Sequence, residues 1–409
     1  MSQNTTCVII GGGPAGMIAG LLLARAGVAV TVLEKHSDFL RDFRGDTIHP
    51  TTLELLDELG LIDEFNVIRH SRLHGLILHD ENTGPFQAVD IGRLNVKYPY
   101  IAMAPQWDFL NLLASAGVAE PSFRLIMDAE FTEFLYTEDT ITGVRYAVDG
   151  KVHDLHALLT IAADGRASRA RTHARLPVTS YPVPIDLWWF RVNTSEPVGE
   201  AIRPTSAKGK IFIAIPREGY VQMACLINKD SDMDLRAEGI EPLRAAIAQA
   251  VPEAAKSAKK MSWDEVKLLQ VEVNRLTRWY RNGLLCLGDA AHAMSPVGGV
   301  GVNLAVQDGV ATARILAEPL RTGQLSLNDL RAVQRRREGA AKFTQRLQRL
   351  MHQVIHPLIT QQQGLTIPGP IKTTLETFPQ LGKIPARLLL YGWRPEHAPD
   401  FARRPNSKM

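Results

Sequence analysis

This 409-residue chain has few cysteines, little net charge and no long apolar run. Its three cysteines, Cys7, Cys225 and Cys286, are widely spaced, so we expect buried reduced thiols and neither a disulfide framework nor a metal site. A formal net charge of +3 gives no case for nucleic-acid binding. No segment reaches about 18 uninterrupted apolar residues, and a signal-peptide pattern is missing. We therefore expect a cytoplasmic protein without membrane association.

The composition is that of an ordinary globular protein. Apolar residues make up 45% of the chain and charged residues 22%, which is close to the usual balance. The length leaves room for two or three domains.

The N-terminal stretch 8–35 has the pattern of a βαβ nucleotide-binding unit. A β-branched run leads into three glycines, a helix-length apolar segment and a second strand-like run. Gly11 permits a tight turn, Gly13 lets the backbone approach a pyrophosphate, and Gly16 lets the helix pack close to the strand. Glu34 follows the second run, where a carboxylate accepts hydrogen bonds from a ribose. The stretch therefore predicts a dinucleotide site at a helix N-terminus.

A charged loop, residues 36–49, separates this unit from a helix that Pro50 opens and Gly60 ends. Its position after the ribose-binding acid puts Arg41 and Arg44 within reach of a bound dinucleotide. For Arg41, a solvated surface position is an equally good interpretation.

The remaining periodicity predicts an interleaved α/β architecture. Short alternating runs predict antiparallel strands, and 3.6-residue periodicity predicts several helices, the last two at about 302–320 and 327–355. We expect a Rossmann-like dinucleotide-binding domain with an inserted antiparallel β-sheet domain for the substrate, and C-terminal helices. The predicted ranges are 1–71, 100–175 and 265–355 for the first domain, 72–99 and 176–264 for the second, and 356–409 for an irregular tail.

Two further motifs stand at predicted strand ends. Asp164 begins DGRASRAR, which fits the pattern DGxxSxxR, although Asp164 could simply cap a helix there. Gly288 begins GDAAHAMSPVGGVGVNLAVQDG, in which an apolar strand delivers Asp289 and a glycine-rich loop leads into a helix. An acid in this place suits a ribityl hydroxyl, and the N–H groups of the loop suit the edge of an isoalloxazine ring.

Together the three motifs resemble those of the class A flavoprotein monooxygenases, the para-hydroxybenzoate hydroxylase family. The resemblance implies non-covalent FAD, with NADH or NADPH as a co-substrate that needs no second dinucleotide domain. It further implies that a flavin C4a-hydroperoxide, formed with O₂, hydroxylates an aromatic or heteroaromatic small molecule. Oligomeric state, substrate and general base stay open.

The resemblance also implies which residues hold the cofactor. Gly13 and its neighbours would meet the pyrophosphate, Glu34 the adenosine ribose, and Asp164 both FAD and the nicotinamide donor. Pro296 would wall the oxygen-reacting face of the flavin. The implied cofactor-binding positions are Gly11, Gly13, Ala15, Gly16, Glu34, Lys35, Arg44, Gln106, Asp164, Asp289, Gly301, Val302 and Asn303.

Several side chains keep two interpretations. Apolar residues of the second region could wall a substrate pocket or form its core: Trp188, Trp189, Phe190, Phe212 and Met223. Three histidines could lie near the site or at the surface: His49, His74 and His79. The basic residues of the helix from Leu327 could be a solvated face or could meet an acidic partner or anionic membrane.

Other flavin chemistry is the main alternative. A flavin-dependent halogenase would need a tunnel lysine and commonly a WxWxIP segment, and DLWWFRV does not fit that pattern. Another FAD-dependent oxidoreductase, such as an isoprenoid reductase, would not predict DGxxSxxR. A flavin-binding module without turnover belongs to a different class, and the intact motifs argue against it.

Overall fold

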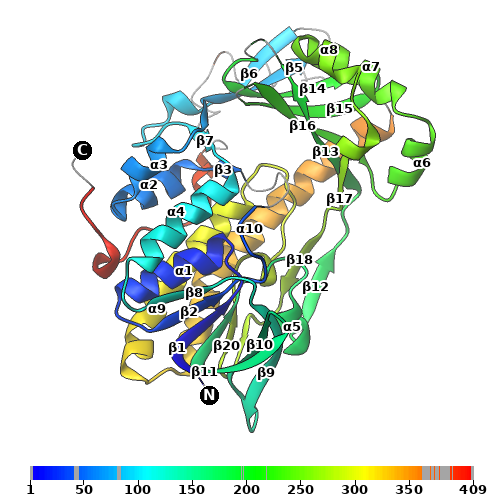
Figure 1. Ribbon diagram of the computed structural model, residues 1–409. Helices are drawn as coiled ribbons and strands as arrows, with labels where there is room; N and C mark the ends of the chain where they lie inside the picture. The colour runs from blue at the N-terminus through cyan, green and yellow to red at the C-terminus, as the bar shows by residue number, and fades with distance from the viewer. Residues whose placement is uncertain are drawn as a thin grey trace.

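The computed structural model describes residues 3–40, 46–80, 84–194, 196, 198–217, 219–361, 369, 373, 377, 387–388 and 390–406. Arg41 and Arg44 lie outside the described residues. The chain forms two lobes, called lower and upper as they stand in Figure 1.

The lower lobe is built on an eight-stranded sheet in the order β19-β20-β11-β1-β2-β8, with β10 beside β11 and β9 beside β10. From β20 to β8 the strands are parallel. The end of β1, Cys7 to Ile10, is buried in a core cluster that includes residues of α1 and α9 and apolar residues of strands β9 and β10. The bounds are β1 (Gln3–Ile10), β2 (Val30–Leu33), β8 (Phe123–Ile126), β9 (Glu130–Thr137), β10 (Thr140–Val148), β11 (Lys151–Ala162), β19 (Tyr280–Arg281) and β20 (Leu284–Cys286).

The helices of this lobe pack closely on one another. A Cβ atom on Gly309 would lie 2.9 Å from the Ala15 carbonyl oxygen, so glycine is required where α9 crosses α1. Helix α10 then runs from the lower lobe towards the upper sheet (Figure 1). The bounds are α1 (Pro14–Arg25), α2 (Pro50–Glu58), α3 (Ile62–Val67), α4 (Gln106–Val118), α5 (Arg169–His173), α9 (Gly301–Thr322) and α10 (Leu327–Thr360).

The upper lobe is a seven-stranded sheet in the order β17-β13-β16-β15-β14-β5-β6. Its pairs are antiparallel, as predicted, except that β14, a strand we did not predict, runs parallel to β5. Helices α6, α7 and α8 pack on its outer face (Figure 1). The bounds are β5 (Gly75–Asp80), β6 (Gly84–Asp90), β13 (Ile185–Asn193), β14 (Ala201–Ala207), β15 (Lys210–Pro216), β16 (Tyr220–Asn228), β17 (Lys267–Leu269), α6 (Asp232–Ala237), α7 (Glu241–Ala250) and α8 (Ala255–Ala258).

Two small sheets complete the fold. One pairs β12 (Val178–Tyr181) with β18 (Val273–Leu276) in a ribbon between the lobes, and the other has the order β3-β7-β4. Its strands are β3 (Thr47–Ile48), β4 (Ser71–Leu73) and β7 (Ile101–Met103).

Two predicted elements are each divided in two. The predicted strand 266–274 is β17 in the upper sheet followed by β18, because the Val271 N–H donates to the Asp186 carboxylate (2.8 Å) and leaves the ladder. Strand β17 therefore belongs to the upper sheet, although it lies in the range 265–355 that we predicted for the first domain. The predicted helix 236–251 is α6 and α7, separated at Gly239, whose φ of +89° ends a helix.

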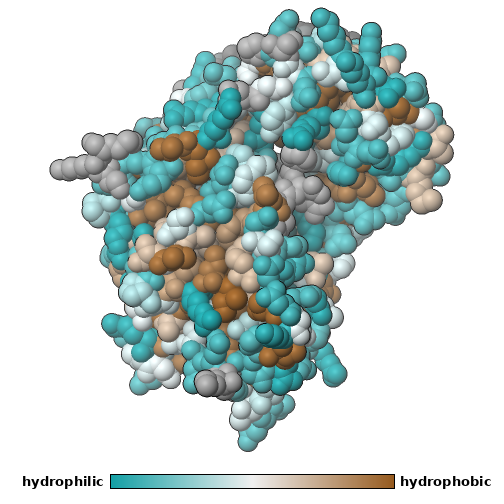
Figure 2. All heavy atoms as spheres, in the orientation of Figure 1, coloured by the Kyte–Doolittle hydropathy of each residue, from teal (hydrophilic) through white to brown (hydrophobic). Residues whose placement is uncertain are grey.

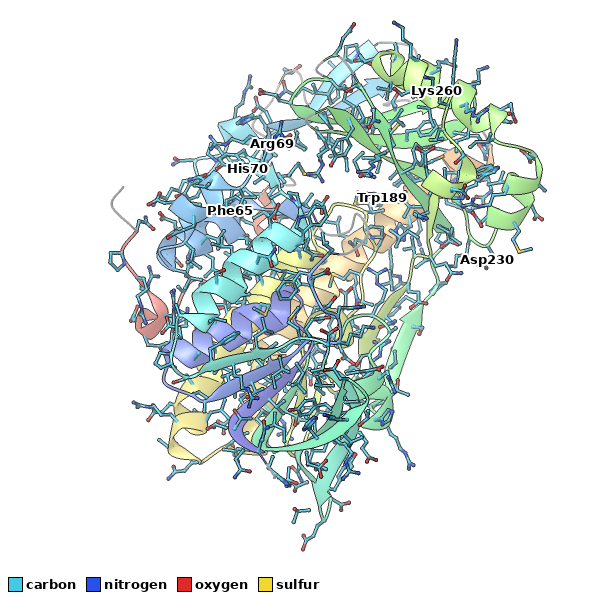
Figure 3. All side chains as sticks on the ribbon, in the orientation of Figure 1. Phe65, Arg69, His70, Trp189, Asp230 and Lys260 are labelled. Atoms are coloured by element: carbon cyan, nitrogen blue, oxygen red, sulfur yellow. The ribbon has the colours of Figure 1, made fainter. Side chains whose placement is uncertain are left out.

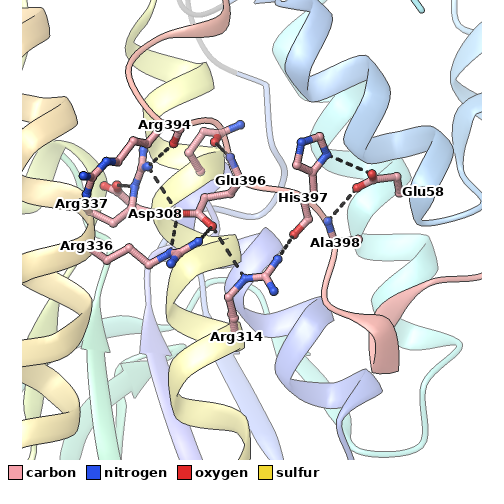
Figure 4. Close-up of polar contacts among 10 residues, drawn as sticks. Glu58, Asp308, Arg314, Arg336, Arg337, Arg394, Glu396, His397 and Ala398 are labelled. Carbon is pink, nitrogen blue, oxygen red and sulfur yellow. Dashed lines mark hydrogen bonds and ion pairs between the residues drawn. The ribbon is translucent and has the colours of Figure 1, made fainter.

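The C-terminal segment is held to the lower lobe by buried charges (Figure 4). Asp308 on α9 pairs with Arg337 on α10 (2.9 Å), and Arg337 lies 3.6 Å from Glu396. Arg336 also forms two 2.7 Å hydrogen bonds with Glu396. An unpaired charge in such surroundings would be costly, so this network fixes residues 394–398 against both helices.

The three cysteines are free and buried, as predicted, and burial raises the pKa of the Cys225 thiol to about 12. In the described part of the chain, no helix is both long enough and apolar enough to cross a membrane.

Candidate active site

Four neighbouring parallel strands deliver the predicted site residues to one edge of the lower sheet. Gly11 follows β1, Glu34 follows β2, Asp164 comes shortly after β11, and Asp289 comes shortly after β20. Ligands of open α/β sheets bind at this carboxyl edge. The sheet order therefore brings the three sequence motifs together.

The three glycines of the first motif differ in what they make room for. Gly11 has a φ of +103°, and a Cβ atom there would lie 2.5 Å from the Ala163 carbonyl oxygen. A Cβ atom on Gly16 would lie 2.1 Å from the Gly11 carbonyl oxygen. On Gly13 the nearest atom would be 4.0 Å away. Gly11 and Gly16 are therefore required by the fold, whereas Gly13 keeps space open in front of α1.

Glu34 is buried, and its carboxylate is oriented by the backbone. Its Oε2 accepts the Gly12 N–H (2.9 Å) and its Oε1 accepts the His36 N–H (3.2 Å). A carboxylate offers about four acceptor positions, so a ribose hydroxyl can share this group. The neighbouring Lys35 is exposed.

The second motif is a network that links to the third. The Asp164 carboxylate accepts from the Ser168 hydroxyl (2.6 Å) and the Ala170 N–H (3.0 Å) at the start of α5. The N-cap residue of this short helix is Ser168, so Asp164 supports the cap and is not itself the cap. Arg171 donates to the Asn274 side chain (3.1 Å) and to the Ala290 carbonyl oxygen (3.4 Å). Sequence reasoning included Arg171 in the pattern but did not predict this crosslink.

Asp289 faces an arginine that we did not predict. Arg166, inside the second motif, places Nη2 at 3.5 Å from the Asp289 carboxylate, and both side chains are 30% exposed. The other terminal nitrogen of Arg166 is buried and has no hydrogen-bond partner among the described residues. This donor is available to an anionic group between the two motifs.

The glycine-rich loop of the third motif is fastened from two sides. The Gly299 carbonyl oxygen accepts from Thr47 (2.8 Å), and the Asn303 Oδ1 accepts from Thr51 (2.7 Å) and Thr52 (2.9 Å). A Cβ atom on Gly301 would meet nothing within 4 Å. The N-terminus of α9 is thus held in place with open space in front of it.

Helix α10 holds the part of the loop that carries Pro296, which is half-buried. The Gln348 amide donates to the carbonyl oxygens of Ser295 (2.8 Å) and Val297 (2.9 Å). It also accepts the Ser295 N–H (3.2 Å). Val302, at the start of α9, is buried.

Gln106 stands at the start of α4, where its N–H donates to Asp46 (3.3 Å). Asp46 also pairs with Arg217 (2.6 Å), from the turn between β15 and β16, and both side chains are almost fully buried. Burial raises the pKa of Asp46, and Arg217 opposes part of that rise. This ion pair joins the lobes beside the site, and no sequence pattern indicated it.

A family model described as "FAD binding domain" matches residues 4–346. The chain belongs to this FAD-binding family. Among curated proteins, the 6-methylpretetramide 4-monooxygenase of Streptomyces rimosus is 31% identical over 356 residues, which cover 84% of this chain and 83% of that protein.

Solved structures share the fold of this chain. The p-nitrophenol 4-monooxygenase PnpA from Pseudomonas putida DLL-E4 has a TM-score of 0.73 at 21% identity and covers 95% of this chain and 98% of its own. The myxobacterial chondrochloren halogenase CndH has a TM-score of 0.73 at 18% identity and covers 98% and 99%. At these identities the likeness shows the fold alone.

The predicted resemblance and fold class are confirmed: the chain is a flavoprotein oxidoreductase of the monooxygenase type. The roles of single residues towards FAD stay predictions.

In this FAD-binding protein the two faces of the upper sheet have different surroundings. Four of the five predicted wall residues, among them Trp188, are buried in a core cluster with α7 and α8. The fifth, Trp189, projects from the opposite face towards the lower lobe (Figure 3), because strand residues alternate in direction. It packs with Ile213 in the same cluster as Val297. Trp189 therefore lies on the face that meets the glycine-rich loop of the third motif.

The three histidines that we considered as site candidates also differ in their surroundings. His49 is buried, with Nε2 at 3.0 Å from the Gly299 carbonyl oxygen and Nδ1 at 3.3 Å from that of Leu390, so it adjoins the glycine-rich loop. Burial lowers its pKa. His74 is exposed, and the side chain of His79 lies outside the described part of the chain.

Proposed function

We propose that this protein binds FAD and uses NADH or NADPH with O₂ to hydroxylate an aromatic or heteroaromatic small molecule. The observation that carries the proposal is the meeting of the three motifs at one sheet edge, below the Trp189 face of the upper sheet. Figure 2 shows the surface hollowed where the two lobes meet.

The residues at this edge fit FAD. Backbone N–H groups of α1 start beside the open space at Gly13, and no side chain caps this helix. A dinucleotide pyrophosphate would supply the missing acceptors there. The open space at Gly301 would take the flavin edge, and the free donor of Arg166 would meet an anionic part of the cofactor.

The Trp189 face fits a flat ring that carries a polar substituent. Ile213 and Val297 offer apolar contact in the same cluster as Trp189. The indole Nε1 of Trp189 is buried and has no partner among the described residues. A buried donor without a partner is costly, so a hydroxyl or carbonyl oxygen of a bound substrate would complete it.

When bound, FAD supplies the redox chemistry that activates oxygen. The contribution of the chain is to hold the ring against the loop that carries Pro296 and to exclude water from that space. The apolar cluster around Val297 serves both purposes.

The test combines cofactor content with turnover. Wild-type protein should keep its flavin through gel filtration, and NAD(P)H oxidation should accelerate with some members of a panel of phenols and consume O₂. Asp289→Ala should lose most of its flavin, whereas Asp139→Ala, an exposed hairpin residue, should not.

Two results would contradict the proposal. Full flavin retention by Asp289→Ala would remove Asp289 from the cofactor site. A requirement for halide and for a separate flavin reductase would indicate a halogenase instead.

A further inference from the structure

A groove lined with basic residues lies on α10, next to the face of this helix that contacts the glycine-rich loop. It is formed between the β12–β18 ribbon and α10 and has a volume of about 220 Å³. Its lining residues are Tyr181, Arg275, Lys342, Gln345, Arg346 and Arg349.

The groove has more positive charge than its surroundings neutralise. Lys342 pairs with Glu338 one helical turn earlier (2.7 Å). Within the described ranges, no carboxylate pairs with Arg275, Arg346 or Arg349. By contrast, Arg336 and Arg337 of the same helix are used in the buried network with Glu396. The basic residues of this helix therefore include two that pair with Glu396 and a separate set that lines this groove.

Two of the guanidinium groups are held in position before any ligand binds. Arg275 donates to the Gln345 Oε1 (2.6 Å) and to the Tyr181 hydroxyl (2.7 Å). Arg349 stacks over the Tyr181 ring, 4.8 Å from its centroid. Fixed guanidinium groups lose less conformational entropy when they bind an oxyanion, and their planar forks match phosphate oxygens.

The size of the groove restricts its ligand. Pockets that enclose drug-sized molecules usually measure about 300–1,000 Å³, so this groove suits a smaller group, and four of its six lining residues are basic. A phosphate or diphosphate group is small enough and carries the complementary charge.

The groove is connected to the site already described. The Gln345 amide donates to the carbonyl oxygens of Ala293 (3.0 Å), in the third motif, and Asn274 (2.8 Å). Asn274 in turn accepts from Arg171 of the second motif (3.1 Å). A ligand that contacts Arg275 would therefore bind one hydrogen bond away from the residues that hold both motifs.

We propose that this groove binds the phosphate or diphosphate group of a small molecule or lipid, at a place separate from the FAD crevice. The phosphate can come from the nicotinamide co-substrate, from a lipid headgroup or from another phosphorylated compound. Only the first of these sources rests on the proposed function.

The test is calorimetric titration of the flavin-loaded protein with inorganic diphosphate at low ionic strength. We expect Arg346→Gln and Arg349→Gln each to weaken binding about tenfold, a loss of about 1.4 kcal/mol. The matched control is Arg335→Gln, because Arg335 is exposed on the same helix, 11 positions and about 16 Å from Arg346. The control should bind like wild type.

Absence of diphosphate binding to the wild type, or equal loss in Arg335→Gln, would overturn the proposal, whatever the enzyme's activity. Competition then identifies the source. Displacement of diphosphate by NADPH but not by NADH would assign the 2′-phosphate of the co-substrate. Displacement by phosphatidylserine vesicles would assign a lipid headgroup, and displacement by none of these would leave another phosphorylated compound.

Discussion

At the scale of single residues, the glycines of the first motif are needed for different reasons: some by the fold and one by a ligand. Gly16 sits against the Gly11 carbonyl oxygen, so any side chain there would disturb the turn itself. Gly13 has no such neighbour, and its φ of −74° is open to other residues. Only a ligand can explain why the space in front of Gly13 is useful.

Gly13→Ala should therefore weaken FAD binding about tenfold or more, which corresponds to about 1.4 kcal/mol, and leave the apoprotein's melting temperature nearly unchanged. The added methyl group would occupy the space in which a pyrophosphate approaches the backbone. Flavin fluorescence titration and thermal melts of the apoprotein measure the two effects. Gly339→Ala, where the added methyl meets nothing within 4 Å, is the matched control; normal affinity in Gly13→Ala would refute this role.

Site residues that directly follow a strand could be predicted from the sequence, because the strand and the turn are both visible in the local pattern. Gly11, Glu34, Asp164 and Asp289 all lie where strand ends were expected. Asp46 and Arg217 were not predictable, because they are 171 positions apart and each has an ordinary neighbourhood in sequence. The aromatic run at Trp188 and Trp189 showed alternation, but alternation alone does not say which face meets the other lobe.

At the scale of elements, α10 has two different faces beside the glycine-rich loop. Gln345, Gln348 and His352 are buried and recur at helical spacing, and all three bond to the loop or its neighbours. The basic residues on the adjacent face line the groove. The sequence predicted this helix from its periodicity, but buried glutamines break the apolar pattern and so concealed its contact with the loop.

Gln348→Ala should loosen the loop around Pro296 because it removes three hydrogen bonds to Ser295 and Val297. Each buried backbone group left without a partner costs about 1–3 kcal/mol. A looser loop would also admit water. We expect the ratio of hydroxylated product to NAD(P)H consumed to fall and peroxide release to rise. Gln353→Ala, an exposed position of the same helix, should keep the wild-type ratio; an unchanged ratio in Gln348→Ala would show that the loop does not need this contact.

At the scale of the whole molecule, distant parts of the chain are joined by buried charges. One joint fastens the C-terminal segment to α9 and α10 through Asp308, Arg337 and Glu396 (Figure 4). Burial alone would raise the pKa of Asp308, but His292 and Arg337 outweigh burial and hold this pKa below its usual range.

Asp308→Asn should lower the free energy of unfolding by about 3–5 kcal/mol at neutral pH, since it leaves Arg337 short of its partner. The wild-type carboxylate has a folded pKa below its unfolded value of about 3.9. Its contribution is therefore present above that value and is lost as the pH falls through the folded pKa. In urea unfolding, the difference between variant and wild type should shrink below about pH 4. The exposed Asp400 supplies the control, Asp400→Asn; a difference that does not change with pH would contradict this assignment.

The second joint, Asp46 with Arg217, connects the lobes beside the site. Here burial raises the pKa of Asp46 in spite of Arg217. The effect of this acid on stability therefore depends on pH in the opposite direction from that of Asp308. Protonation of Asp46 favours the folded state. This contribution is fully present below the unfolded pKa of about 3.9 and is lost as the pH rises through the folded pKa. The neutral variant Asp46→Asn should therefore gain stability relative to wild type as the pH rises through this window.

A double-mutant cycle tests the ion pair between Asp46 and Arg217. Arg217→Met leaves the Asp46 carboxylate buried without its cation, so we expect a loss of about 3–5 kcal/mol in the free energy of unfolding at neutral pH. Adding Asp46→Asn removes the unpaired charge and should restore most of that loss, because a neutral amide still accepts the Gln106 N–H. Urea unfolding of the two single variants and the double variant forms a complete cycle. Simple additivity of the two changes would mean that the pair does not couple the lobes, whereas recovery in the double variant would show that this buried charge pair couples the upper sheet to the lower lobe.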